Sequence, residues 1–340
     1  MNPQQAFERI KHNTQEIVSE DELLAVLKRG NSKAYFGTAP TGMVHTGYLI
    51  PITKIADFLE VGVNFTILLA DMHSHLDDMK SPFELLKHRA EYYKEVILGL
   101  FEGIGVATDA LTFVLGSDFE LKEQYAMDLL RLSSVITLGR SRRAGAEVVR
   151  QKEDPKLGSF VYPLMQSLDV PHLDADIAFG GIDQRGIYML GREFLPKLGY
   201  KKPICVFTPL LPGLTGGKMS ASDEGSKINC HDSVKTVKKK MNKSFCPEKE
   251  IEGNGVLSLV KTVIAPYTKR KGVDIEIVRP EKYGGNLYFK SYEELEQTYV
   301  SGDLHPLDLK QGVATYLNIF LEPVRRRLAK RPKILQNAYP

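Results

Sequence analysis

Hydrophobic and polar positions in the first two thirds of the chain form short apolar runs that alternate with helical periodicity. Apolar runs predict strands at 33–37, 64–71, 110–118 and 203–211. Apolar residues at helical spacing predict helices at 49–60 and 81–105, and 174–195 predicts a strand, a glycine turn and a third helix. This alternation favours an α/β fold with a parallel sheet and helices on both faces. Ligands of such folds bind beyond the carboxyl ends of the strands.

Beyond about residue 225 the pattern becomes mostly helical. Helices are predicted at 231–245, 254–267, 291–300 and 307–330, and "RPEKYGGN" (279–286) is the clearest interruption between them. The chain has 340 residues, which is more than one typical domain. We therefore expect two domains, 1–225 and 226–340, with a boundary near 222–230 and a helical segment at the start of the first.

Composition narrows the class of protein. Hydrophobic residues make up 43% and charged residues 26%, which is the balance of a soluble globular protein. No apolar run reaches the ~18 residues of a membrane span, and the polar, acidic N-terminus resembles neither a signal peptide nor a transit peptide. Cys205, Cys230 and Cys246 lie far apart and fit no zinc spacing. We expect a reduced, cytoplasmic protein with no membrane contact and no metal-ligating residues.

Basic residues gather in three runs although the net charge is only +3. The runs are "GRSRRAGAEVVRQK" (139–152), "KTVKKKMNK" (235–243) and "VRRRLAKRPK" (324–333). Any one of them can be a solvated helix face. Three together raise the prospect of a phosphate-rich partner, such as a nucleic acid.

The stretch "TAPTGMVHTGY" (38–48) places a histidine between a predicted strand and a predicted helix. The start of a helix presents unpaired N–H groups and the positive end of the helix dipole. Glycines in the preceding turn let a phosphate approach this backbone, and His45 can donate to a phosphate oxygen. The alternative is an incidental histidine in a loop.

A second glycine-rich stretch, "PGLTGGKMSASDEG" (212–225), carries Lys218. Flexible glycines let a lysine swing over a bound polyphosphate. The stretch is not a P-loop, because no apolar helix follows the lysine. The alternative is an exposed hinge between two domains.

Two further motifs present polar side chains together. In "YPLMQSLD" (162–169), Tyr162, Gln166 and Asp169 are spaced i, i+4, i+7, so one helix face carries all three. In "FGGIDQR" (179–185), a glycine turn brings Gln184 towards the same pocket. The alternative for the first motif is a polar outer face.

Taken together, these motifs resemble a known family. His45-Thr46-Gly47-Tyr48 and Lys218-Met219-Ser220-Ala221-Ser222 resemble the paired signatures of class I aminoacyl-tRNA synthetases, although Ala221 stands where the family usually has a second lysine. With "YPLMQSLD", "FGGIDQR" and Tyr35 in "YFGTAPTG", the chain from about residue 33 to its end is similar to archaeal and eukaryotic cytosolic tyrosyl-tRNA synthetases.

The resemblance implies a Rossmann-type nucleotide-binding catalytic domain followed by a mainly helical anticodon-binding domain. It implies that ATP, accompanied by Mg²⁺, activates tyrosine as an adenylate, from which tyrosine passes to tRNA(Tyr). It also implies a homodimer, with an insertion around 115–160 supplying the interface. No tightly bound cofactor is expected.

The resemblance also implies roles for individual residues in the catalytic domain. His45, Lys218, Ser220 and Ser222 would serve catalysis, and Gly37, Thr38, Gly47, Tyr48 and Met219 would join His45 and Lys218 in binding ATP. Tyr35 and Asp169 would hold the phenolic hydroxyl of tyrosine. Tyr162, Gln166 and Gln184 would hold its ammonium group, with Ala70 and His73 also in the tyrosine pocket. Carboxylate, amide and phenol oxygens are suitable acceptors for these groups.

In the second domain, "KYGGN" (282–286) and "HPLDLK" (305–310) resemble the anticodon-reading elements of the same family. Tyr283 would stack on the first anticodon base, and Asp308, in the same element as His305, would accept from a guanine edge. Arg185 matches a position near the acceptor end of the tRNA. The plainer interpretation of the two motifs is a turn and a capped helix start.

Two alternatives remain. The tryptophanyl enzyme shares this fold and often the "KMSAS" spelling, but Asp169 in "YPLMQSLD" and Arg185 directly after "GIDQ" favour tyrosine. The other alternative is a non-catalytic RNA-binding paralogue. Such proteins often lose the phosphate-binding histidine or lysine, whereas this chain keeps both His45 and Lys218.

Overall fold

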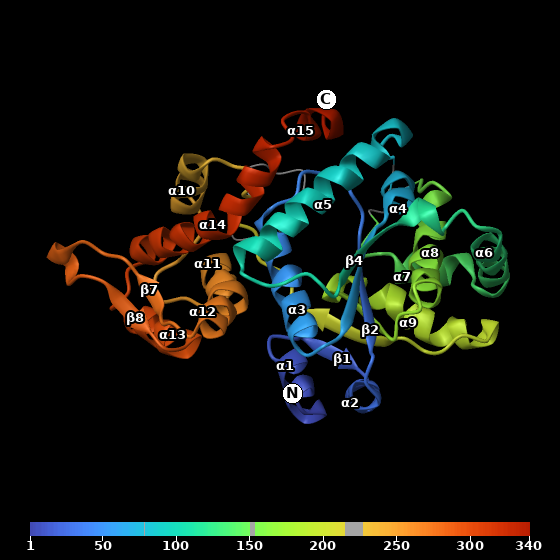
Figure 1. Ribbon diagram of the computed structural model, residues 1–340, viewed down its shortest axis with the longest axis horizontal. Helices are drawn as coiled ribbons and strands as arrows, with labels where there is room; N and C mark the ends of the chain where they lie inside the picture. Colours follow the sequence, from blue (N-terminus) through green and yellow to red (C-terminus); the bar gives the residue numbers. More distant parts are fainter. Residues whose placement is uncertain (78, 150–153, 215–226) are drawn as a thin grey trace.

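A six-stranded sheet organises the first part of the protein (Figure 1). The structure, a computed structural model, describes residues 1–77, 79–149, 154–214 and 227–340. The strand order is β1-β6-β5-β2-β3-β4, and all neighbours are parallel except β1 and β6. The strands are β1 (Glu16–Val18), β2 (Lys33–Thr38), β3 (Asn64–Leu69), β4 (Leu111–Leu115), β5 (Ile177–Gly181) and β6 (Ile204–Thr208).

The predicted α/β fold and its parallel strands are confirmed as β2 to β6. The N-terminal segment is helical, as expected, in α1 (Pro3–Lys11) and α2 (Glu20–Arg29), but β1 lies between these helices. Three residues are too few to show a strand periodicity. The partner of β1 is β6, which lies almost 190 residues further along the chain by the pairing of Ile17 with Val206.

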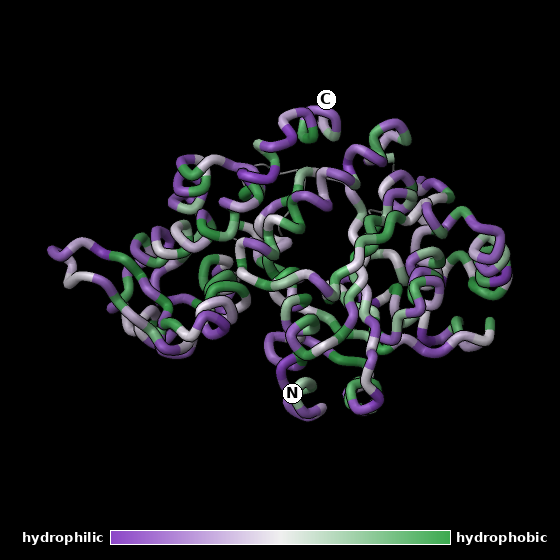
Figure 2. The backbone as a smooth tube through the Cα atoms, viewed as in Figure 1, coloured by the Kyte–Doolittle hydropathy of each residue, from purple (hydrophilic) through white to green (hydrophobic). Residues whose placement is uncertain are grey.

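Helices cover both faces of the sheet, and side chains alternate between them. On one face, Phe65, Ile67 and Phe179 pack with α3 (Leu49–Glu60) and α5 (Leu86–Gly103). On the other face, the sheet packs with α8 (Gly158–His172) and α9 (Arg185–Phe194), through the residues Leu68, Ala178, Phe207, Val170 and Tyr188. Figure 2 shows the hydrophobic residues concentrated along these strands and on the helices around them.

Three more helices belong to the first part. They are α4 (Asp71–Leu76), α6 (Glu123–Val135) and α7 (Leu138–Ala144). Helices α6 and α7 lie within the segment expected as an insertion around 115–160, and α6 lies at the end of the molecule opposite the β7–β8 hairpin (Figure 1).

The C-terminal part is mainly helical, as predicted, with one small hairpin. The hairpin, β7 (Ile275–Ile277) and β8 (Leu287–Phe289), was not predicted, and it encloses the expected interruption at 279–286. The helices are α10 (Val234–Asn242), α11 (Gly255–Leu259), α12 (Ala265–Lys271), α13 (Tyr292–Ser301), α14 (Pro306–Ala329) and α15 (Lys333–Ala338). The domain boundary near 222–230 falls partly outside the described residues and stays a prediction.

Helix α14 crosses α5 at very close range. A Cβ atom on Gly103 would lie 2.1 Å from the Phe320 carbonyl oxygen, and one on Gly99 would lie 2.7 Å from the Val324 Cα. Only glycine permits this approach, because real Cβ atoms do not come within 3.0 Å of other atoms. One continuous apolar core therefore joins the sheet to the C-terminal helices.

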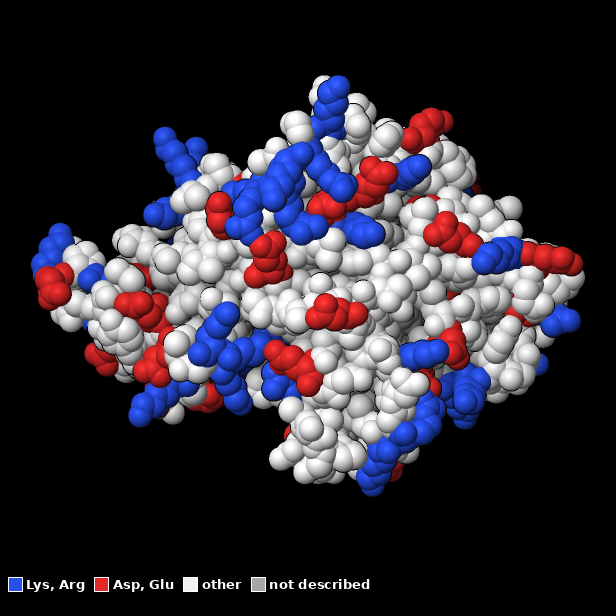
Figure 3. Space-filling view, in the orientation of Figure 1, with Lys and Arg blue, Asp and Glu red and all other residues white. Residues whose placement is uncertain are grey.

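The third basic run covers the last turns of α14 and the residues that follow it, and its arginines are largely paired with carboxylates. Arg327 and Arg331 contact Glu95 of α5 at 2.9 Å and 3.4 Å, and Arg326 pairs with Glu102. Figure 3 shows Lys and Arg gathered over this region with acidic residues beside them. These arginines therefore reinforce the contact between α5 and α14.

The structure also describes the three cysteines and the length and apolar character of the helices. Cys205, Cys230 and Cys246 are buried free thiols. Among the described residues, no helix combines the length and the apolar character that crossing a bilayer requires.

Candidate active site

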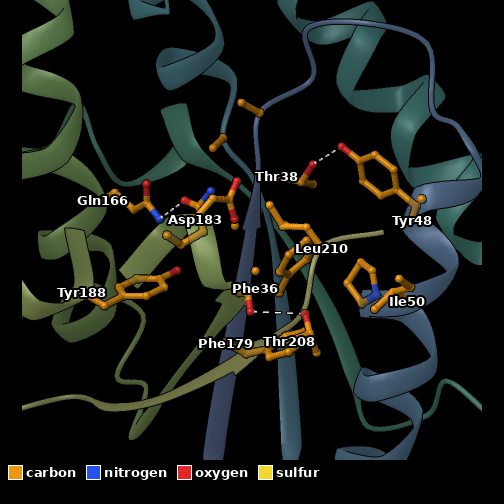
Figure 4. A pocket seen from close by; sticks show the side chains of 18 of the residues that line it. Phe36, Thr38, Tyr48, Ile50, Gln166, Phe179, Asp183, Tyr188, Thr208 and Leu210 are labelled. Carbon is orange, nitrogen blue, oxygen red and sulfur yellow. Dashed lines mark hydrogen bonds between the residues drawn. The ribbon is translucent and has the colours of Figure 1, made fainter. Parts of the chain in front are cut away.

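A cavity of about 360 Å³ opens at the carboxyl ends of β2, β5 and β6. Between β2 and β5 the strand order reverses, because β3 follows β2 on one side and β5 lies on the other. Such a switch point is where doubly wound sheets bind ligands. Figure 4 shows Gln166, Asp183 and Tyr188 at one end of the cavity and Thr38, Tyr48 and Ile50 at the other.

The two glycines at the end of β5 lie close to side chains of the cavity wall. A Cβ atom on Gly181 would lie 2.5 Å from the Asp183 Oδ1, and one on Gly180 would lie 3.0 Å from the Gln184 Cγ. Both glycines line the cavity. Their missing side chains leave room for Asp183 and Gln184 to reach its wall.

His45 begins the short helical turn Thr46–Tyr48 that leads into α3. Its Nδ1 accepts a hydrogen bond from the Gly47 N–H at 3.2 Å, so the proton of the neutral ring lies on Nε2. Burial, with the Lys227 charge as a lesser cause, lowers the pKa of His45 to about 4. His45 therefore lines the cavity as a neutral donor at physiological pH.

The other residues expected around ATP meet His45 at this end of the cavity. Gly37, Thr38, Gly47 and Tyr48 all line it. Thr38 Oγ1 and Tyr48 Oη share a hydrogen bond of 2.8 Å, which joins the end of β2 to the start of α3 (Figure 4). The expected residues Lys218, Met219, Ser220 and Ser222 lie outside the described residues.

At the opposite end, α8 presents Tyr162, Gln166 and Asp169 on one face, and all three line the cavity with Gln184. Gln166 Nε2 donates to Gln184 Oε1 at 2.9 Å. The buried Gln166 Oε1 has no hydrogen-bond partner among the described residues. A buried acceptor without a partner in a cavity wall indicates a site for a donor on a ligand.

Tyr35 lies behind the cavity and is not among the described residues that line it. It is fully buried, and its hydroxyl donates to the Gln166 carbonyl oxygen at 3.2 Å. Its ring meets Tyr188 edge to face, with centroids 6.2 Å apart. In this structure Tyr35 thus supports α8 and Tyr188.

Ala70 and His73 line the cavity where β3 passes into α4. The fully buried His73 lies between Glu120 and Asp169, and ligand-type atoms of the three side chains lie within 4.8 Å of one another. The imidazole contacts both carboxyl groups directly, at 3.3 Å and 3.7 Å. We therefore interpret the cluster as an internal ion-paired group.

Sequence reasoning missed several residues that line the cavity. Asp183 directly precedes Gln184 in the recognised motif, and Tyr188 follows Gln184 by one helical turn, so both could have been found by extending that motif. Further lining residues lie in or after the strands or in α3, and no sequence signal marks them; they include Phe36, Ile50, Phe179, Thr208 and Leu210.

The residues expected to meet RNA lie outside this cavity. Arg185 pairs with Glu16 of β1 through two contacts of 2.6 Å and 2.9 Å. Tyr283 is exposed between β7 and β8, and His305 caps α14 with Asp308 in its first turn. Among the described residues, no side-chain partner of Asp308 is recorded.

Arg279 links the two segments that resemble anticodon-reading elements, "KYGGN" and "HPLDLK". Its guanidinium donates to the Gly285 carbonyl at 2.9 Å and to the Asp303 carbonyl at 3.5 Å, just before the start of α14. The turn between β7 and β8 also projects farther from the sheet than the rest of the C-terminal part (Figure 1). "KYGGN" and "HPLDLK" therefore belong to one end of the molecule.

At the switch point, the helix start at His45 suits a phosphate group, and a polar pocket lies opposite it. These features are typical of doubly wound nucleotide-binding proteins. The family model for class I tRNA synthetases (W and Y) matches residues 27–322, and the chain belongs to this family. Similar proteins are the tyrosine–tRNA ligase of Haloarcula marismortui (48% identity, covering 100% of this chain and 98% of the relative) and the cytoplasmic tyrosine–tRNA ligase of Saccharomyces cerevisiae (46%; 97% and 85%).

Among solved structures, the tyrosyl-tRNA synthetase of Archaeoglobus fulgidus complexed with L-tyrosine is similar over 96% of this chain and 100% of its own. The TM-score is 0.89 and the identity 41%. The resemblance to tyrosyl-tRNA synthetases and the predicted fold class are confirmed.

We predict that His45→Ala slows adenylate formation by about ten- to a hundredfold, the loss expected for a hydrogen bond to a charged group. Tyrosine affinity should change little, because His45 lies at the opposite end of the cavity. Single-turnover adenylate formation and equilibrium tyrosine binding separate the two effects.

The matched control for this prediction is His88→Ala, which removes a half-buried histidine of α5 that does not line the cavity. Because the pKa of His45 is about 4, the difference in rate between wild type and His45→Ala should not vary between about pH 6 and pH 8. A rate difference that grows or shrinks over this range would show that His45 changes its charge there.

Proposed function

We propose that this chain attaches tyrosine to tRNA(Tyr) at the expense of ATP, through a tyrosyl-adenylate intermediate. The observation that carries this proposal is the unpartnered Gln166 Oε1 in a cavity wall that also holds Tyr162, Asp169 and Gln184. Such a group of acceptors suits a ligand with an ammonium group at one position and a hydroxyl at another.

The first reaction joins the two ends of the cavity. The tyrosine carboxylate attacks the α-phosphorus of ATP, and pyrophosphate leaves. A terminal ribose hydroxyl of the tRNA then attacks the tyrosyl carbonyl, and AMP leaves. The protein needs no nucleophilic side chain, so its contribution is alignment of the reactants and stabilisation of developing charge.

Each end of the cavity has a defined task in this reaction. Neutral His45 donates from Nε2 to a phosphate oxygen, and Lys218 adds a positive charge there. Gln166, Gln184 and Tyr162 accept from the substrate ammonium group. Asp169 and Tyr35 hold the phenolic hydroxyl, and Tyr35 also supports α8 through its hydrogen bond to the Gln166 carbonyl.

Asp169 also accounts for selectivity. Phenylalanine would leave the buried Asp169 without its partner, and an unpaired buried polar group is costly. The indole of tryptophan carries a single N–H donor on a larger ring. The similarity to tyrosine–tRNA ligases favours tyrosine over the substrate of the tryptophanyl enzyme.

We further propose that ATP arrives as its magnesium complex, because Mg²⁺ in nucleotide sites is held largely by phosphate oxygens and water. The protein residues that face these phosphates are His45 and, in our proposal, Lys218. A cytoplasmic location is proposed from the similar yeast protein, which is named cytoplasmic. The division into a catalytic domain (1–225) and an anticodon-binding domain (226–340) is part of the same proposal.

The assay for this function is ATP–pyrophosphate exchange with each of the twenty amino acids. Tyrosine should support exchange, while phenylalanine and tryptophan should not, because neither offers a hydroxyl to Asp169. Exchange with tryptophan alone would contradict the tyrosine assignment. The absence of exchange with every amino acid would favour a non-catalytic RNA-binding protein.

We also propose that two copies of the chain associate through α6. Apolar side chains are normally scattered singly on a protein surface, so a cluster of them indicates a contact with another protein. The segment that includes α6 is the one expected to supply the dimer interface. Its large exposed apolar residues on and beside α6 are Leu121, Met127, Leu130, Val135 and Leu138.

We predict that Leu130→Asp converts the dimer into a monomer, because it places a charge in the apolar contact. Sedimentation velocity measures the change in molar mass. Val273→Asp is the control, since this side chain is similarly exposed (56%, against 65% for Leu130) but lies in the C-terminal part. A monomeric wild-type protein, or a Leu130→Asp dimer, would contradict the proposed interface.

At the other end of the molecule, we propose that Tyr283 and Asp308 read the anticodon. Exposed aromatic rings stack on unpaired bases, and carboxylates accept from base edges. Tyr283 lies in a turn with Gly284 and Gly285 at φ +94° and +71°, a conformation that suits glycine. The turn therefore presents the tyrosine ring outward from a defined backbone.

Exposed lysines on α10 supply a phosphate contact in this proposal. Lys235, Lys238 and Lys239 are exposed, whereas Lys240 is held by Asp232 at 2.8 Å. Replacing the exposed lysines would weaken the binding of every tRNA anticodon variant equally and would reduce the salt dependence of that binding.

We predict that Tyr283→Ala and Asp308→Ala leave ATP–pyrophosphate exchange unchanged and impair charging of tRNA(Tyr). Loss of a stacking contact costs about 1–3 kcal/mol. The loss should be largest for the native guanine at the first anticodon position. Tyr288→Ala removes an equally exposed ring (60%, against 59% for Tyr283) from β8 and is the control. Equal charging of all anticodon variants by both mutants would refute the anticodon assignment.

A further inference from the structure

Glu120 is a buried carboxyl group to which the proposed reaction assigns no role. It follows the short helical turn after β4, precedes α6, and does not line the cavity. Its Oε1 lies 3.3 Å from His73 Nδ1, while His73 Nε2 lies 3.7 Å from Asp169 Oδ2. All three side chains are at least 96% buried. His73 thus separates Glu120 from the residue that faces the substrate.

The charge state of each of these three side chains depends on the other two. Neither nitrogen of His73 and neither carboxylate oxygen of Glu120 forms a hydrogen bond with another described residue. A buried charge needs a partner, because desolvation makes an isolated one very costly. The contact between Glu120 and His73 therefore favours an imidazolium paired with a carboxylate.

The net charge of the buried cluster then determines whether Asp169 is protonated. With His73 protonated and both carboxyl groups ionised, the cluster carries a net charge of −1 away from water. With a proton on one carboxyl group, the cluster is neutral. Since Glu120 already pairs with His73, the proton belongs on Asp169.

Tyr125 also contacts Asp169. The Tyr125 hydroxyl oxygen lies 2.9 Å from the Met165 carbonyl oxygen and 2.8 Å from Asp169 Oδ1. A phenol has one proton and donates it to one of these two acceptors at a time. Burial and the Glu120 charge raise the pKa of the Asp169 carboxyl group, whereas the hydrogen bond from Tyr125 lowers it. Asp169 Oδ2 remains available as the acceptor for a substrate hydroxyl.

The pKa shifts agree with this proton count. Burial lowers the pKa of His73, but the Glu120 and then the Asp169 carboxylates outweigh burial and raise it to about 9. Burial raises the pKa of Asp169 to about 8, the His73 charge opposes this, and the Glu120 charge adds to it. The other titratable groups that face the cluster are Asp71 and the tyrosines Tyr35, Tyr125, Tyr162 and Tyr188.

We propose that Glu120 is a positioning residue of the amino acid pocket, which pairs with His73 and thereby keeps Asp169 in its protonated form beneath the substrate hydroxyl. This inference rests on the proposed function for its link to tyrosine, but the pairing itself is a property of the free protein. Glu120 acts through His73 and Asp169 and does not touch the substrate.

The experiment compares wild type with Glu120→Gln, which removes the charge and keeps the shape. NMR titration of the His73 imidazole, in protein labelled at histidine, should show its midpoint near pH 9 in wild type. In Glu120→Gln the midpoint should fall by at least ~1 pH unit. The midpoint of Asp169 should fall as well, because Glu120 no longer opposes its ionisation. An unchanged His73 midpoint would overturn the proposal.

Two further variants separate charge from packing. Glu120→Asp keeps the charge on a shorter side chain and should keep the high His73 midpoint, whereas a purely structural role would affect both variants alike. Asp118→Asn removes an exposed carboxylate two residues away and should shift nothing. A shift of equal size in Asp118→Asn would show a general charge effect and overturn the proposal.

The pH profile of kcat/KM for tyrosine provides the functional readout. The part of this profile that reflects the titration of Asp169 and His73 should move to lower pH in Glu120→Gln. The titration of free tyrosine affects both enzymes equally and does not contribute to the difference. A wild type that does not activate tyrosine would refute the proposed function. The His73 titration would still test the pairing, so the two failures are distinguishable.

Discussion

The cavity depends on one topological constraint, the reversal of strand order at β2. Strand β3 pairs with one edge of β2, and β5 pairs with the other. The strands that follow β2 in the chain therefore lie on one side of it first (β3, β4) and on its other side afterwards (β5, β6). The start of α3, with His45, and the face of α8, with Gln166, therefore approach a common space from two sides. Both chemical ends of the site are consequences of this single arrangement.

Burial gives the two ends of the cavity opposite proton chemistry. At the phosphate end, burial keeps His45 neutral, so it contributes a directed hydrogen bond without a full charge. At the other end, two carboxyl groups hold His73 in its charged form. The same side chain, in environments that differ only in their neighbours, thus becomes a neutral donor in one place and a buried cation in the other. Charge for the polyphosphate must come from elsewhere, which is the task proposed for Lys218.

Sequence patterns predicted the parts of this structure that have local causes. The strands β2 to β6 follow from apolar runs, and the shared face of Tyr162, Gln166 and Asp169 follows from helical spacing. What the patterns missed depends on distant partners. Strand β1 exists because it pairs with β6, and Glu120 acquires significance only when folding places it against His73. Tyr35, which was expected to hold the substrate hydroxyl with Asp169, is not among the described residues that line the cavity, and its hydroxyl donates to the Gln166 carbonyl.

Helix α5 contacts both the loop that leads to His45 and the C-terminal helix α14. Its Tyr93 hydroxyl donates to the Gly42 carbonyl at 2.7 Å, and Tyr339 near the end of α15 donates to the same oxygen. Arg89 of α5 donates to the Thr41 and Ala338 carbonyls at 2.7 Å and 3.1 Å. The loop that leads to His45 is therefore held by α5 and by the C-terminal segment together. On its other side, α5 meets α14 through glycines that leave no space between the backbones. Because α14 begins at "HPLDLK", the turn at His45 and this motif, which are proposed to meet ATP and RNA, are connected through the packed pair of α5 and α14.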